Sequence, residues 1–128
     1  RYALFASPAY LARRGRPASP ETDLRGHDLV TYDARMDALP EVDWLRARAT
    51  DDDLTLRFNT LAGIVAAVES GAGLGVLPDF LAGDHLVCLC AGEALPRREV
   101  WLAVHEDVHR LPRVRTVVDF LAAQLAAA

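Results

Sequence analysis

The stretch NTLAGIVAAVESGAGLGVLP, residues 59–78, decides the fold that this sequence predicts. Four of its apolar residues recur with helical spacing and predict one buried helix face: Leu61, Ile64, Val65 and Val68. Asn59 is expected to cap this helix, because its side-chain carbonyl can accept an N–H group of the first turn. Gly71 and Gly73 suit the backbone conformations that end helices, and a second apolar run follows them.

The residues before this helix predict a strand, because apolar and polar side chains alternate over residues 54–58. The stretch is therefore a β-α-β unit, which is typical of parallel sheets covered by helices. Ligands of such sheets bind beyond the carboxyl ends of the strands, where helix N-termini present free N–H groups. Asn59 and Thr60 come at such a point. They either serve only the helix or also receive an anionic or polar small molecule.

Composition indicates one soluble domain in a chain of 128 residues, with 52% hydrophobic and 25% charged residues. The formal net charge is −4, and the 14 basic residues are all arginines scattered along the chain, which argues against direct DNA binding. Without a membrane-spanning run or signal peptide, a cytoplasmic protein is expected. Because the chain begins at Arg1 within strand-like sequence, we expect it to be part of a longer protein.

Turn and capping residues predict where the remaining strands and helices lie. Strands are expected over residues 2–6, 28–32, 86–89 and 99–104. Helices are expected after Ser7, which precedes a proline and can act as an N-cap, from Pro40, and from Pro112. Cys88 and Cys90 would lie on one face of a regular strand, as two buried and reduced thiols. No metal site, cofactor site or catalytic constellation is expected.

Three segments of the chain together resemble one protein family. They are FASPAYLARRGRP (5–17) with DLRGHDL (23–29), NTL (59–61) with AAVESGAGLGVLP (66–78), and LPRVR (111–115) with VDFL (118–121). In this order, and over nearly the whole chain, they resemble the effector-binding domain of LysR-type transcriptional regulators.

The resemblance implies an α/β fold of the type 2 periplasmic-binding-protein kind, with two lobes joined by two crossing strands. Residues 7–98 would form the complete second lobe. Residues 1–6 and 99–128 would supply the crossing strands and the C-terminal part of the first lobe, including its last helix. The family's N-terminal helix-turn-helix, its linker helix and most of the first lobe would lie outside this sequence.

The implied function is regulatory: a small effector binds between the lobes and changes how a homodimer or tetramer presents its DNA-binding domains. Such a domain is not an enzyme, and DNA and membranes are not partners of this chain itself. The resemblance assigns ligand contacts to Ser7, Asn59 and Thr60, with Thr31 and Tyr32 as pocket-wall residues.

Two alternatives use the same scaffold. A solute-binding protein would have a signal peptide upstream, whereas a regulator would have a helix-turn-helix. An α/β enzyme such as a prephenate dehydratase or a deaminase would need an acid, a base or a cofactor-binding lysine in the cleft, and this chain has no lysine.

Overall fold

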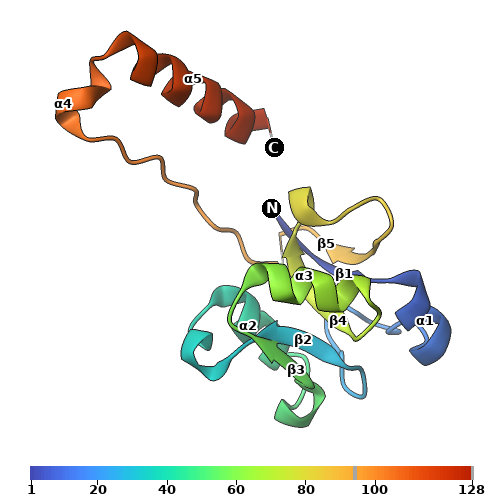
Figure 1. The fold of residues 1–128 in the computed structure, drawn as a ribbon. Helices are drawn as coiled ribbons and strands as arrows, with labels where there is room; N and C mark the ends of the chain where they lie inside the picture. The colour runs from blue at the N-terminus through green and yellow to red at the C-terminus, as the bar shows by residue number, and fades with distance from the viewer. Residues whose placement is uncertain (94, 128) are drawn as a thin grey trace. The chain divides into compact units, whose positions relative to one another are not determined.

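A computed structural model describes residues 1–93 and 95–127. The chain divides into two compact units, Arg1–Arg97 and Arg98–Ala128. The first unit holds one mixed sheet and its helices, and the second holds two further helices (Figure 1).

The first unit is built on a five-stranded sheet with the order β3-β2-β4-β1-β5. The strands are β1 (Tyr2–Ala6), β2 (Leu29–Tyr32), β3 (Leu56–Phe58), β4 (Leu74–Pro78) and β5 (Val87–Ala91). β2 runs parallel to both β3 and β4, whereas β1 runs antiparallel to β4 and β5. The carboxyl ends of β2, β3 and β4 therefore meet the start of β1 at one end of the sheet, which we call the carboxyl edge.

Three helices and three short 3-10 turns connect these strands. They are α1 (Pro8–Arg14), η1 (Ala34–Met36), α2 (Pro40–Arg46), η2 (Asp51–Asp53), α3 (Leu61–Glu69) and η3 (Asp79–Leu81). The expected first helix is confirmed, because the Tyr10 N–H donates to Ser7 Oγ at 3.2 Å and Gly15 ends α1 with a φ of 79°. The β-α-β unit of residues 54–78 is confirmed as β3, α3 and β4.

The core lies on both faces of the sheet, as expected for an α/β layer. One buried cluster joins α1 to one face through Tyr10, Leu4 and Leu74. The other joins α3 to the opposite face through Ile64 and Val68, and it includes Phe5, Val30 and Leu77. Burying each such side chain stabilises the fold by roughly 1.5–3 kcal/mol relative to leaving it in water. Apolar contacts on both faces thus hold the sheet between α1 and α3.

The expected cap of α3 is wrong by one residue. Thr60, not Asn59, is the N-cap: its Oγ1 accepts the N–H of Gly63 at 3.2 Å, and the helix begins at Leu61. Thr60 has the extended backbone of a cap, with φ −136° and ψ 145°. The absence of a side chain at Gly63 lets this first turn lie against Phe58, whose Cδ1 would stand 2.7 Å from an added Cβ. Asn59 is left exposed, with its amide uncommitted to the helix.

A bulge in β5 overturns the expectation that both cysteines share a face. Phe5 pairs with Cys88 and Leu4 pairs with Cys90, so the residue between the cysteines, Leu89, has no partner of its own on β1. Leu89 and Cys90 consequently both point into the α1-side core, while Cys88 is exposed. An inserted residue shifts the alternation of a strand by one, and this shift separates the two thiols.

The second unit contains α4 (Glu106–His109) and α5 (Pro112–Ala127). The expected helix from Pro112 is confirmed, but the expected strand over residues 99–104 is wrong: this segment is irregular, with Trp101 83% exposed. A strand needs backbone hydrogen bonds from a neighbour, and no described strand pairs with it. His105 caps α4, because its Nδ1 accepts the N–H of Asp107 at 3.2 Å.

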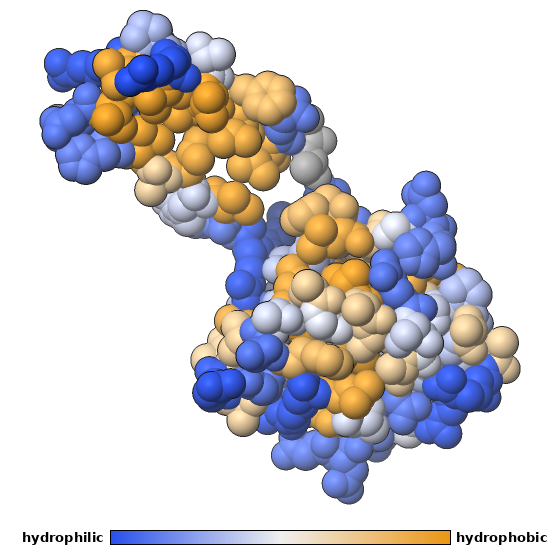
Figure 2. All heavy atoms as spheres, in the orientation of Figure 1, coloured by the Kyte–Doolittle hydropathy of each residue, from blue (hydrophilic) through white to orange (hydrophobic). Residues whose placement is uncertain are grey.

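Apolar side chains gather on one face of this second unit (Figure 2). Together with Arg113, they line a groove of about 460 Å³: Leu102, Val104, Val114, Val117, Val118 and Leu121. Among the described residues, no helix combines the length and the apolar character needed to cross a membrane.

Candidate functional site

The carboxyl edge of the sheet is held together by backbone hydrogen bonds just beyond the strands. The N–H of Asp33, which follows β2, donates to the carbonyl of Phe58 at 2.9 Å, and the N–H of Asp79, which follows β4, donates to the carbonyl of Arg1 at 3.0 Å. Open α/β sheets bind ligands at this end, where parallel strands finish and helices begin. The side chains that the fold places at this edge are therefore the candidates for ligand contacts.

Asn59 and Thr60 lie at this edge, between the end of β3 and the start of α3, and both are exposed. The Thr60 hydroxyl is occupied by the Gly63 N–H, and the Thr60 carbonyl accepts from the Ile64 N–H at 3.3 Å. The N–H groups of Leu61 and Ala62 have no partner among the described residues. The Asn59 amide and these two donors can therefore receive a polar or anionic group.

Thr31 and Tyr32 end β2 at the same edge, but both side chains are buried, at 2% and 6% exposure. Successive strand residues point to opposite faces, and Tyr32 packs in the α3-side core with Val30. They support the edge from within and present no exposed side chain to it.

Ser7 lies at the opposite end of the sheet, because β1 runs against β4. Its hydroxyl caps α1 and is 3% exposed, and it stands beside Gly71, which precedes β4. The five residues of β4 separate this end from the carboxyl edge, or about 13 Å at roughly 3.3 Å per residue. The structure thus brings Asn59, Thr60, Thr31 and Tyr32 to one edge and leaves Ser7 away from them.

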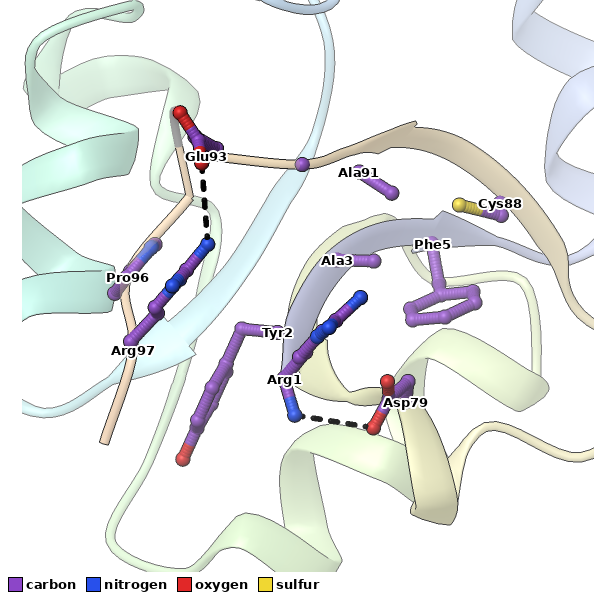
Figure 3. A pocket seen from close by; sticks show the side chains of 11 residues that line it. Arg1, Tyr2, Ala3, Phe5, Asp79, Cys88, Ala91, Glu93, Pro96 and Arg97 are labelled. Carbon is purple, nitrogen blue, oxygen red and sulfur yellow. Dashed lines mark hydrogen bonds and ion pairs between the residues drawn. The ribbon is translucent and has the colours of Figure 1, made fainter. Parts of the chain in front are cut away.

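A pocket of about 550 Å³ at the β1–β5 end of the same edge was missed by sequence reasoning (Figure 3). Its apolar wall includes Ala3, Phe5 and Cys88, and its charged rim consists of Arg1, Asp79, Glu93 and Arg97. Arg97 pairs with Glu93 at 3.7 Å. The β5 bulge pairs Cys88 with Phe5 and so places Cys88 in this wall, and no local sequence signal marks that bulge.

The electrostatics of the edge keep Asp33 ionised. The Arg35 guanidinium donates to Asp33 Oδ2 at 3.0 Å and holds the pKa of that carboxyl below its usual value. Because Asp33 is paired in this way, its charge opposes an incoming anion less than a free carboxylate would. No group of three or more potential metal ligands occurs in the described part of the chain.

Residues 1–126 match the family described as the LysR substrate binding domain. The chain belongs to this family. The resemblance noted in the sequence is thereby confirmed, and so is the expected α/β, periplasmic-binding-protein-like fold class.

Two solved structures resemble this LysR substrate binding domain. The regulatory domain of CrgA, a LysR-type transcriptional regulator from Neisseria meningitidis, is 23% identical with a TM-score of 0.66, and the match covers 98% of this chain and 64% of that one. A structure of CrgA itself is 22% identical with a TM-score of 0.65, and the match covers 98% of this chain and 45% of that one. At these identities the likeness establishes the fold. No curated protein sequence matched the chain.

Proposed function

We propose that this LysR substrate binding domain is the effector-sensing part of a LysR-type transcriptional regulator and binds a small polar or anionic metabolite at the carboxyl edge. The observation that carries the proposal is the exposed Asn59 amide, placed directly before the N-terminus of α3 at the end of a parallel strand. The family match supports a binding function at this edge over a catalytic one.

Recognition would combine three donors that converge on one region. The Asn59 amide donates and accepts hydrogen bonds, and the free N–H groups of Leu61 and Ala62 donate only. The start of α3 carries about half an elementary positive charge, which favours a carboxylate or another anion. An anion at this position gains roughly 0.3–1 kcal/mol from the helix alone, so most of the affinity must come from direct hydrogen bonds and the remaining cleft wall.

The way in which binding would act on the regulator is also a proposal. Residues 7–98 would form one lobe, and residues 1–6 and 99–128 would belong to the connections and the other lobe. An effector with different affinities for two lobe arrangements shifts the population toward one of them. In a homodimer or tetramer, that shift would change how DNA-binding domains outside this chain are presented.

A thermal-shift screen of small carboxylates and polar metabolites against the chain tests the proposal. A true effector raises the Tm of the wild type, and Asn59→Ala removes at least half of that rise while leaving the Tm without ligand within experimental error. Gln124→Ala, which truncates the other side-chain carboxamide in the chain on the exposed helix α5, is the matched control and should retain the full shift. Equal shifts in both variants would refute the assignment of Asn59.

A further inference from the structure

We propose that a second site binds a small phosphate-type oxyanion. It lies beside the start of β2, at the opposite end of the sheet from the carboxyl edge. The site is a surface pocket of about 350 Å³, which is at the small end of the range for ligand pockets. It is lined by Arg16, Pro17, Ala18, Ser19, Asp23, Arg25 and His27. It shares no lining residue with the candidate effector site and does not rest on the proposed function.

His27 presents a hydrogen-bond donor to this pocket. The buried Tyr10 hydroxyl accepts the N–H of Asp28 at 2.9 Å, so its own proton is available for His27 Nδ1, which lies 3.2 Å away. Burial raises the pKa of Tyr10, which keeps that proton in place. We assign Nδ1 as the acceptor on this ground, and the neutral ring then carries its hydrogen on Nε2. Because Nδ1 faces Tyr10 and the ring lines the pocket, Nε2–H is the edge left for a ligand.

The single carboxylate of the pocket is already neutralised by a neighbour. Asp23 accepts from Arg25 Nε at 2.9 Å and from Arg25 Nη2 at 2.8 Å, a bidentate pair that holds the pKa of Asp23 well below its usual value. The pair fixes the guanidinium of Arg25 at the rim of the pocket. Its remaining N–H groups are still able to donate to a ligand.

Arg16 supplies the uncompensated charge. No ion pair or hydrogen bond of its guanidinium is found within residues 1–93 and 95–127, and the residue is exposed at the pocket. Neighbouring Arg14, by contrast, is committed to Asp28 at 3.3 Å and to the Gly26 carbonyl at 2.7 Å. In a chain with a net charge of −4, residues 13–27 carry four arginines against two acids, so this region is locally positive.

The pocket therefore combines one free guanidinium, one shared guanidinium, an imidazole N–H and the Ser19 hydroxyl. All of these can donate hydrogen bonds, and the one carboxylate is already engaged. A cation would lack acceptors here, and an apolar ligand would leave the donors unsatisfied. An oxyanion with several acceptor oxygens matches the set, and arginine is suited to such recognition because its fork binds two oxygens at once.

The test is a titration of the chain with sodium phosphate. Binding is measured in two ways, from the imidazole ¹⁵N signals of His27 in NMR spectra and from the heat in isothermal titration calorimetry. Sodium chloride at matched ionic strength controls for screening, and glycerol phosphate shows whether the site accepts an esterified phosphate as well as the free ion. Arg16→Gln is the key variant. Arg110→Gln removes the same charge from an exposed arginine with no described ion pair and is the matched control.

We expect phosphate to move the His27 Nε2 signal, and Arg16→Gln to weaken phosphate binding about fivefold, whereas Arg110→Gln leaves it unchanged. Binding by either phosphate form supports the site. The proposal is overturned if chloride reproduces the shift, if both arginine variants weaken binding equally, or if phosphate binds without affecting His27.

Discussion

The Ser7 hydroxyl stands against Gly71, so closely that a Cβ added at Gly71 would lie 3.2 Å from Ser7 Oγ. Gly71 follows α3 with a φ of +83°, and its carbonyl accepts from Arg13 Nη2 at 2.8 Å. This contact joins the start of α1 to the end of α3. It also explains why Ser7 is buried at the end of the sheet away from Asn59.

Gly71→Ala is expected to lower the free energy of unfolding by about 1–2 kcal/mol for the positive φ alone, with a further loss from crowding against Ser7. Urea denaturation followed by circular dichroism measures the change. Gly26→Ala is the matched control, because Gly26 has a φ of +78° but no atom within 4 Å of an added Cβ. If both variants lose the same stability, the Ser7 contact contributes nothing.

Thr60→Ala should destabilise the chain by about 1 kcal/mol, because Thr60 Oγ1 satisfies the Gly63 N–H at the start of α3. Asn59→Ala should change stability by less than about 0.5 kcal/mol, since Asn59 is exposed and does not cap the helix. The midpoints of chemical denaturation of the two variants provide the comparison. A larger loss for Asn59→Ala would restore Asn59 as the cap.

Stability should fall as the pH is lowered from about 7.5 to 5.5 because of His27. Burial, assisted by the charge of Arg14, lowers the pKa of His27 in the folded chain. A histidine with a lowered folded pKa favours the fold when neutral. Its contribution is therefore present above the unfolded pKa of about 6.5 and is lost as the pH falls below that value.

Thermal unfolding across this pH range measures the effect, and His27→Gln should flatten the profile over the same interval. The carboxyls with lowered pKa values, Asp23, Asp33 and Asp53, contribute stability that is lost only as the pH falls well below 5.5. These carboxyls therefore do not contribute to the change in stability between about pH 7.5 and 5.5 that is expected from His27. An unchanged slope in His27→Gln would assign the pH dependence elsewhere.

The two cysteines should differ sharply in reactivity. Cys88 is exposed on the pocket wall, whereas Cys90 is buried in the α1-side core, where burial raises the pKa of its thiol. In the folded chain, iodoacetamide should alkylate Cys88 at least tenfold faster than Cys90, as measured by peptide mass spectrometry. Unfolding in urea should make the rates similar. Equal rates in the folded chain would contradict the bulge in β5.

Local sequence determined much of the fold. The β-α-β unit could be predicted because the periodicity of apolar residues in 54–78 is a local property that does not depend on distant partners. The caps at Ser7 and Gly15 were equally local, since each satisfies backbone groups within its own helix. The three segments that resemble the family are also short stretches of local sequence, so the resemblance to the LysR substrate binding domain could be stated before the structure was known.

Only the tertiary structure decided which of the predicted ligand-contact residues lie at the same end of the sheet. Ser7 and Asn59 both follow strands and precede helices, and sequence gave no reason to separate them. The antiparallel direction of β1 places them at opposite ends of the sheet, because a strand's direction depends on which neighbour it pairs with. The β5 bulge and the missing strand at 99–104 have the same origin. Pairing between strands is long-range, whereas helices and caps are completed within a few residues.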